Sequence, residues 1–201
     1  MKNNKRLMDK IITEPMTMEH LSDIGELHYK ILYWSVNGKL GKEHIYKLYN
    51  ALFQCDSFFG YVYYFQGRLI GFTTATTDFR EVRKAIEQVY EKKIMEIIIR
   101  YLFQPRYLIG FFESKFIVPL VYKKYNVKAE WLTLVTDLSK PFLNSLVASK
   151  LISNIYDHFK KLGMTYMAQA VKNNPKAINY YNKLHWKRVC TLFIHNIYIF
   201  K

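Results

Sequence analysis

Residues 136–186 decide the fold, and they read TDLSKPFLNSLVASKLISNIYDHFKKLGMTYMAQAVKNNPKAINYYNKLHW. Apolar residues recur there at the spacing of one helix face, and Gly163 follows where a left-handed C-terminal cap is favoured. The residues on that face are Val147, Leu151, Ile155, Phe159 and Leu162. The spacing therefore predicts a helix that ends before Gly163 and buries one face.

A strand and a second helix follow. TYMAQAV (165–171) has the length and the residue types of a strand. KNNPKAINYYNKL (172–184) predicts a helix, because the Asn174 side chain can accept a hydrogen bond from the first turn and Pro175 suits the first helical position. The order strand, helix, strand, helix predicts an α/β protein with a parallel or mixed sheet.

The first half of the chain predicts two helices and a β-hairpin. Apolar stripes indicate the helices, and a loop with Asn37, Gly38 and Gly41 separates them. Two runs of aromatic and β-branched residues flank Gly67, so we expect them to pair. The expected elements are a short strand at 11–15, helices at 16–32 and 42–53, and strands at 58–66 and 68–77.

The second half adds an insertion and three further strands. Residues 79–128 are basic and aromatic, and they read as helical segments divided at Pro105. The run 129–138 is a fourth strand, and 186–201 reads as two closing strands. Strict alternation along the fourth strand would put Leu132, Leu134, Thr136 and Leu138 on one face and Trp131, Thr133, Val135 and Asp137 on the other.

Composition favours one domain over residues 1–201. Half of the 201 residues are hydrophobic, so the chain can bury a core. The two cysteines, Cys55 and Cys190, form no redox or metal motif, which suits a reducing cytoplasm. No two of the six histidines stand at metal-ligand spacing, so we expect no metal.

The formal charge of +14 predicts an attraction to polyanions. The phosphates of coenzyme A, an acidic acyl carrier protein and anionic lipid are alternatives, and a lysine-rich surface without a partner is another. Nucleic acid is disfavoured, because the sequence has no motif of a nucleic-acid-binding module. The apolar region 94–122 is interrupted by charges and by Pro105, so it predicts no transmembrane helix but allows peripheral contact with a membrane.

The end of the opening segment resembles the GCN5-related N-acetyltransferases. That family has the pattern Asn-x-x-Ala-x-x-x-Tyr-x-Lys-x-Gly-Phe, and Asn174, Ala177 and Tyr181 fall on it, whereas His185 and Trp186 replace Gly and Phe. The resemblance implies an α/β (α+β) fold with a mixed, mostly antiparallel sheet of about six to seven strands. It places the helical insertion 79–128 between strands three and four.

The resemblance also implies an acyl-CoA co-substrate. The family's phosphate loop, Gln/Arg-x-x-Gly-x-Gly/Ala, falls on 143–148, where only Ala148 keeps a small residue. Leu146 must then keep its side chain away from the ligand. In the family, strands four and five separate beside a bulge, here expected around 136–138 and 169–171. The implied cofactor-binding residues are Thr136, Asp137, Leu138, Leu143, Asn144, Ser145, Leu146, Val147, Ala148, Ser149, Asn174, Ala177 and Tyr181.

Transfer of an acyl group from a thioester to an amine needs an acid for the leaving thiolate and a base for the amine. The resemblance assigns the acid to Tyr181, although a packing role in the core is the alternative. A glutamate of some relatives falls on Gln169, which cannot take up a proton at neutral pH. Asp137 and Glu130 on the fourth strand, Glu26 and His28 on the first helix, or a water chain are the substitutes.

Three functions follow as hypotheses. The first is an N-acyltransferase that moves an acetyl or longer acyl group from acyl-CoA to a small-molecule amine, such as an amino sugar or an amino acid derivative. The second is an acyltransferase whose donor is an acyl carrier protein. The third is a non-catalytic module with the same fold that binds a partner or an anionic surface through residues 79–128.

Overall fold

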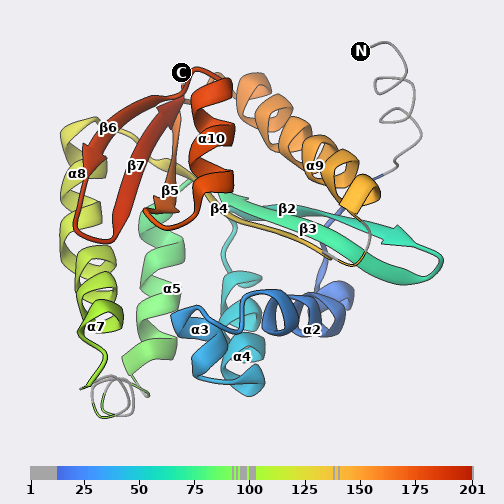
Figure 1. Ribbon diagram of the computed structural model, residues 1–201, viewed down its shortest axis with the longest axis horizontal. Coiled ribbons are helices and arrows are strands. Elements are labelled where there is room, and N and C mark those ends of the chain that lie inside the picture. Colours follow the sequence, from blue (N-terminus) through green and yellow to red (C-terminus); the bar gives the residue numbers. More distant parts are fainter. Residues whose placement is uncertain are drawn as a thin grey trace.

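The computed structural model describes residues 13–91, 93, 95, 99, 103–137, 139 and 141–200. Within these residues, seven strands form one sheet in the order β1-β2-β3-β4-β5-β7-β6, and only β4 and β5 are parallel neighbours (Figure 1). This confirms the mixed, mostly antiparallel sheet. The strands are β1 (Glu14–Pro15), β2 (Phe58–Phe65), β3 (Arg68–Thr76), β4 (Ala129–Thr136), β5 (Tyr166–Val171), β6 (Lys187–Thr191) and β7 (His195–Phe200).

Helices cover both faces of the sheet. Figure 1 shows α9 (Pro141–Lys161) on one side of β2 and β3, and α2 (Leu21–Ile31) and α4 (Lys42–Leu52) on the other. Successive residues of β2 face opposite sides of the sheet: Val62 packs with α2 and α4, whereas Tyr63 packs with α9. This alternation is what a strand buried on both faces requires.

Helix α9 buries the face that its sequence predicts, except at its end. Val147, Leu151, Ile155 and Phe159 are fully buried, but Leu162 lies beyond the helix and is 51% exposed. Gly163 adopts φ 61°, and the N–H groups of Gly163 and Met164 donate to carbonyls of the last helical turn. This glycine cap ends α9 and turns the chain into β5.

The hairpin and both N-terminal helices are confirmed. Gln66 and Gly67 have positive φ angles and connect β2 to β3 by a two-residue turn. A 3₁₀ turn, η1 (Met18–His20), precedes α2. The expected loop between the helices was wrong in one respect: it contains the short helix α3 (Val36–Lys39), because the Ser35 hydroxyl accepts a hydrogen bond from the N–H of Gly38.

The insertion between β3 and β4 covers β5 and β7. It contains α5 (Phe79–Glu91), α7 (Pro105–Phe112), the π-helical turn η2 (Glu113–Ile117) and α8 (Val118–Lys124). Phe79, Val121 and Tyr122 pack there against Met167 and other strand residues. In Figure 1, α5, α7 and α8 stand together along one edge of the molecule. Among the described residues, no helix combines the length and the hydrophobicity needed to cross a bilayer.

Strict alternation along β4 was a wrong expectation. Thr74 of β3 pairs with Thr133 and Ala75 pairs with Trp131, so Leu132 is an extra residue, a β-bulge. Trp131 consequently packs with the aromatic residues of α10 (Pro175–Lys183), whereas Val135 packs with α2 and α4. The bulge therefore redirects the side chains of β4 at its midpoint.

The packing of α9 predicts a large effect of Leu151→Ala. Leu151 is fully buried between α9 and the sheet, so truncation should lower the free energy of unfolding by about 2–5 kcal/mol. Leu162→Ala, at the half-exposed position, should change it by about 0.5 kcal/mol or less. Urea denaturation of both variants measures the difference, and equal effects would contradict the packing described.

Candidate functional site

Strands β4 and β5 separate after a short parallel ladder. Ala129, Glu130 and Trp131 pair with residues 166–168, and no pairing of β4 with β5 follows, although β4 continues to Thr136 and β5 to Val171. The separation begins directly at the Leu132 bulge, earlier on β4 than expected. Thr136 lies in the separated part, and Leu138 lies outside the described residues. Beyond the bulge, the β5-facing backbone groups of β4 have no partner in β5, so they can bind an extended ligand.

Tyr181 lies on α10 against this point of separation. Its ring stacks on Trp186 at 4.9 Å between centroids, and both rings pack edge-on against Trp131 of β4. Tyr181 is only 7% exposed, and burial raises the pKa of its hydroxyl. The hydroxyl is therefore protonated at neutral pH and can donate a proton or a hydrogen bond.

Both ends of α10 hold Tyr181 in place. The Asn174 side chain caps the helix by accepting from the N–H of Ala177 at 3.2 Å, as the sequence predicted. At the other end, His185 has φ 56° and the N–H of Trp186 donates to the carbonyl of Tyr181. The position of His185 is the one where the family pattern has Gly, which explains the preference, because glycine adopts this conformation without strain.

Glu130 is the buried carboxyl group nearest to the separation. It lies one residue before Trp131 and accepts a hydrogen bond from Gln169 of β5 at 2.7 Å. Tyr122 of α8 also lies beside Glu130, although its hydroxyl forms no hydrogen bond within 3.5 Å in the described part of the chain. Burial raises the pKa of Glu130, and the hydrogen bond from Gln169 offsets part of that effect.

Glu130 and Tyr181 are close enough to interact electrostatically. After burial and two neighbouring tyrosines, the charge of Glu130 is a further cause of the raised Tyr181 pKa. A carboxylate with a raised pKa and a protonated phenol thus lie near the same end of the β4–β5 ladder, Glu130 on the face of the sheet that Tyr122 of α8 covers and Tyr181 on the face that α10 covers. An acid and a base in such an arrangement suit proton transfer at one reacting centre.

Two buried polar atoms of β7 have no hydrogen-bond partner among the described residues. They are the Tyr198 hydroxyl and the Asn196 side-chain oxygen, both on β7. The Tyr198 ring contacts Tyr181 at 4.9 Å between centroids. Because buried polar groups are nearly always paired, these two atoms are candidates to bind a polar group of a ligand.

The expected phosphate loop is helical in the structure. Helix α9 already begins at Pro141, so the amides of Ser145, Val147, Ala148 and Ser149 lie inside the helix and bond to its carbonyl groups. In a helix that begins at Pro141, the amides of residues 142–144, among them Leu143 and Asn144, have no partner within the helix and can bind an anion. Leu146 is buried against Tyr63 and Ile70 and therefore stays clear of that helix end.

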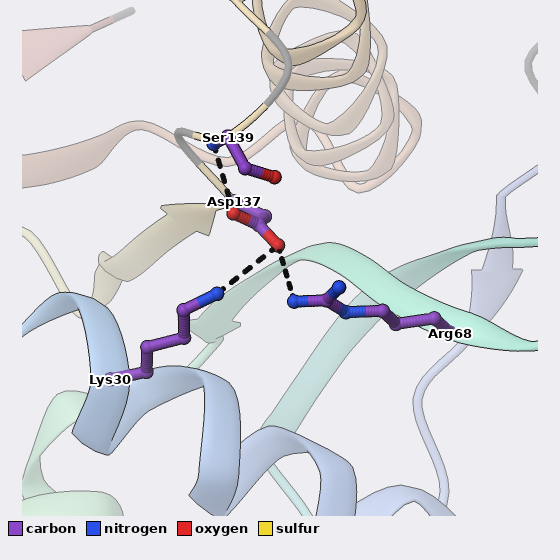
Figure 2. Close-up of polar contacts among 4 residues, drawn as sticks. All are labelled: Lys30, Arg68, Asp137 and Ser139. Atoms are coloured by element: carbon purple, nitrogen blue, oxygen red, sulfur yellow. Dashed lines mark hydrogen bonds and ion pairs between the residues drawn. The ribbon is translucent and has the colours of Figure 1, made fainter.

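Asp137 lies at the far end of β4 and forms an ion-pair network (Figure 2). Its carboxylate is buried and contacts Arg68 at 2.9 Å, Lys30 at 3.5 Å and the N–H of Ser139 at 3.0 Å. Burial alone would raise the pKa of Asp137, but the hydrogen bonds from Ser139 and the two cations outweigh it and lower the pKa. Asp137 is therefore a firmly ionised anchor and a poor proton acceptor.

The two candidates on α2 lie elsewhere. Glu26 is exposed and binds Lys42 and the Tyr46 hydroxyl. His28 is buried between α2 and α4, and its Nδ1 lies 2.9 Å from the Tyr49 hydroxyl. Burial, followed by the charge of His44, lowers the pKa of His28 to about 4, so the ring is neutral at pH 7. Neither residue reaches Glu130 or Tyr181 through a described contact.

Sequence reasoning missed Tyr122, Lys30 and Arg68. Tyr122 lies on α8, and Gln169 lies on β5, 47 residues later in the sequence. No motif marks Tyr122 as a neighbour of the Glu130–Gln169 pair. Lys30 and Arg68 come from α2 and β3, and only the tertiary structure brings them to Asp137. The described residues contain no group of three His, Cys, Asp or Glu side chains that could hold a metal ion.

The fold resembles solved acetyltransferase structures, although the sequence matches no family model and no curated protein. PaiA N-acetyltransferase from Thermoplasma acidophilum, solved with coenzyme A, has a TM-score of 0.57 and 15% identity over 95% of this chain and 99% of its own. Arabidopsis thaliana NAA60, solved with acetyl-CoA, has a TM-score of 0.55 and 13% identity over 95% and 98%.

A third similar structure is the ribosomal-protein-S18-alanine N-acetyltransferase of Escherichia coli. Its TM-score is 0.55, with 9% identity over 94% of this chain and 90% of its own. Similarities at such low sequence identity show the fold alone. The chain has the fold of the GCN5-related N-acetyltransferases, as the sequence resemblance implied.

The Asp137 network predicts a pH-dependent loss of stability in Asp137→Asn. A carboxylate with a lowered pKa in the folded state stabilises the protein above its usual pKa of 3.8, and the contribution disappears as the pH falls through the lower folded value. At pH 7 the variant should be less stable by about 1–3 kcal/mol. Urea denaturation at several pH values should show this gap closing in acid. Asp157→Asn, on the outer face of α9, is the control and should show no comparable gap.

Proposed function

We propose that this protein is an N-acyltransferase that moves an acetyl or longer acyl group from acyl-CoA to the primary amine of a small molecule. The single observation that supports this most is the separation of β4 and β5 at the Leu132 bulge, with Glu130 and Tyr181 beside it. The amine and the thioester meet in one ternary complex, so no acyl-enzyme forms. An amino sugar or an amino acid derivative is the acceptor class that we propose.

Tyr181 is the proposed acid. The amine nitrogen bonds to the thioester carbonyl carbon, the carbon–sulfur bond breaks, and the departing sulfur takes the proton of the Tyr181 hydroxyl. Burial keeps that hydroxyl protonated at neutral pH, and the stack with Trp186 fixes the orientation of the Tyr181 ring. The alternative is that Tyr181 serves only to pack the aromatic cluster.

Glu130 is the proposed base, in place of the family glutamate whose position is occupied by Gln169. The hydrogen bond from Gln169 to Glu130 links the two positions directly. A carboxylate whose pKa is raised by burial is a better proton acceptor than an exposed one. It would take the proton that the amine loses, directly or through a water molecule. Asp137, which has a lowered pKa and three polar partners, is a weaker candidate.

The proposed donor site runs from the bulge to the start of α9. Backbone groups of β4 from Leu132 to Thr136 and Asp137 would bind the pantetheine arm, and the amides of Leu143 and Asn144 would face the diphosphate. The Tyr198 hydroxyl and the Asn196 side-chain oxygen are two further buried polar atoms, and the Tyr198 ring contacts Tyr181. Asn174, Ala177 and Tyr181 would contribute to the same site, as the family resemblance implies. Leu146 replaces the first glycine of the family's loop, and its side chain turns into the core instead of toward the ligand, whereas Ala148 keeps the small residue of the pattern.

Binding of acetyl-CoA tests the donor. Isothermal titration calorimetry at moderate salt should detect one site per chain. Titration with an acylated acyl carrier protein is the parallel experiment, because that donor is the alternative. Binding of the carrier protein without binding of acetyl-CoA would favour the alternative. Binding of neither would contradict both transferase hypotheses and leave a non-catalytic module.

Tyr181→Phe and Glu130→Gln test the two roles. Each variant should bind acetyl-CoA as the unchanged protein does and should lower kcat about 10²- to 10⁴-fold with a panel of amines. The unchanged protein should lose activity in acid as Glu130 takes up a proton, at a pH above the usual glutamate value of 4.5, since burial raises its pKa. This acid limb should be absent from the residual activity of Glu130→Gln.

Tyr180→Phe is the matched control for Tyr181→Phe. Tyr180 is the neighbouring residue on α10 and is only partly buried. It should keep full turnover. If Tyr181→Phe keeps full turnover as well, Tyr181 is a packing residue, and if Glu130→Gln keeps the acid limb, another group is the base.

A further inference from the structure

The insertion between β3 and β4 exposes a row of large apolar side chains. On the nearly continuous helix 105–124, Phe112 is 47% exposed, Phe116 is 56% exposed and Leu120 is 65% exposed. The rings of Phe112 and Phe116 stack at 6.0 Å between centroids. We call these three residues the outer row. A helix that is apolar on its outer side as well as its inner side normally has a partner on both.

The inner side of the same helix already packs against the rest of the protein. Val118, Val121 and Tyr122 are buried against the sheet. Arg83 of α5 donates to the backbone carbonyls of Ser114 and Lys115 in the π-helical turn. The helix is therefore held firmly on the protein, and its outer row is presented in a fixed position.

The charge around the outer row has one sign. Glu113 is the only acidic residue in 105–124, and it points inward, where it accepts hydrogen bonds from the N–H of Ile194 at 2.7 and 2.9 Å. The Lys115 ammonium lies over the Phe116 ring, and Lys123 and Lys124 are exposed at the helix end. An apolar row with cations and no outward carboxylate fits an anionic apolar partner.

A groove of about 250 Å³ lies beside the outer row, between α5 and α8. Pro119 and Leu120 give it an apolar wall, and Arg80, Lys84 and Lys123 contribute cationic groups. Glu87 also lines it, but Arg83 holds that carboxylate at 3.1 Å. The groove thus offers cations for a phosphate group immediately next to an apolar surface.

From this arrangement we propose that the outer face of the insertion docks on the surface of an anionic lipid bilayer. Phe112, Phe116 and Leu120 would enter the boundary between headgroups and acyl chains. Lys84, Lys123 and Arg80 would bind lipid phosphates, with the lysine stems lying along the apolar surface. This contact is peripheral, and it does not depend on the transferase activity proposed above.

A bilayer fits these residues better than a folded protein does. The insertion exposes further large apolar side chains, namely Met95 (64%), Ile99 (68%) and Phe103 (90%). A protein interface needs a complementary shape for each protruding group, whereas a fluid bilayer accepts protruding apolar side chains of any shape. The excess of positive charge beside the outer row, from Arg80, Lys84 and Lys123, also matches anionic lipids.

Co-sedimentation with sucrose-loaded vesicles tests the proposal. The full chain should sediment with vesicles of phosphatidylcholine and phosphatidylglycerol at a ratio of about 7:3, and much less with phosphatidylcholine alone. Raising the salt from about 0.1 to about 0.5 M should weaken the binding. Absence of binding to the anionic vesicles would overturn the proposal.

Two variants separate the apolar and the charged contributions. Phe116→Ser with Leu120→Ser should weaken vesicle binding about tenfold or more, because it removes the inserted side chains. Lys84→Gln, Lys123→Gln and Lys124→Gln together should weaken it about ten- to a hundredfold. All five side chains are exposed, so thermal unfolding should remain near that of the unchanged protein.

Matched controls make the same kinds of substitution elsewhere on the surface. Leu162→Ser with Leu184→Ser removes two exposed leucines, and Lys160→Gln, Lys161→Gln and Lys187→Gln remove three exposed lysines. Both controls should bind vesicles as the unchanged protein does. An equal loss in the controls would mean that net charge or general hydrophobicity causes the binding, which contradicts a defined face.

Two other outcomes would assign the face to a different partner and overturn the proposal. If light scattering without lipid shows a dimer that Phe116→Ser with Leu120→Ser dissociates, the outer row is a contact between two copies. Binding of apo acyl carrier protein that the same variant abolishes, without vesicle binding, would assign the face to an acidic protein.

Discussion

The short parallel ladder between β4 and β5 is the constraint on which the site depends. Three residue pairs hold the strands together, and the Leu132 bulge then adds one residue to β4 and changes its direction. On the α10 side, the Trp131, Tyr181 and Trp186 rings fill the space next to the ladder. A regular ladder along the whole of β4 would pair its backbone groups with β5 and leave no place for an extended ligand.

The same ladder decides which polar groups meet. Glu130 belongs to the part of β4 that pairs with β5, and Gln169 directly follows the last residue of β5 that pairs with β4. Their side chains therefore reach each other across the two strands. The insertion adds Tyr122 to this pair. Burial is then the main cause of the raised pKa values of Glu130 and Tyr181. The site therefore results from packing as much as from the identity of its residues.

The insertion connects the site with the outer surface. Glu113 in the π-helical turn binds the N–H of Ile194 in the β6–β7 connection, which fixes the insertion against the edge of the sheet. The inner face of the helix 105–124 supplies Tyr122 to the neighbourhood of Glu130, and its outer face carries Phe112, Phe116 and Leu120. One helix thus serves two surfaces, because its apolar residues occupy both of its sides.

The sequence by itself determined the order of the elements, since periodicity and caps are local: the spacing from Val147 to Phe159, the Asn174 cap and Gly163 all act within a few residues. It also indicated Tyr181 and Glu130 as candidates. The tertiary structure alone decided the Leu132 bulge and the pairing of Asp137 with Lys30 and Arg68. These features depend on contacts between residues far apart in the chain, and no local pattern encodes such contacts.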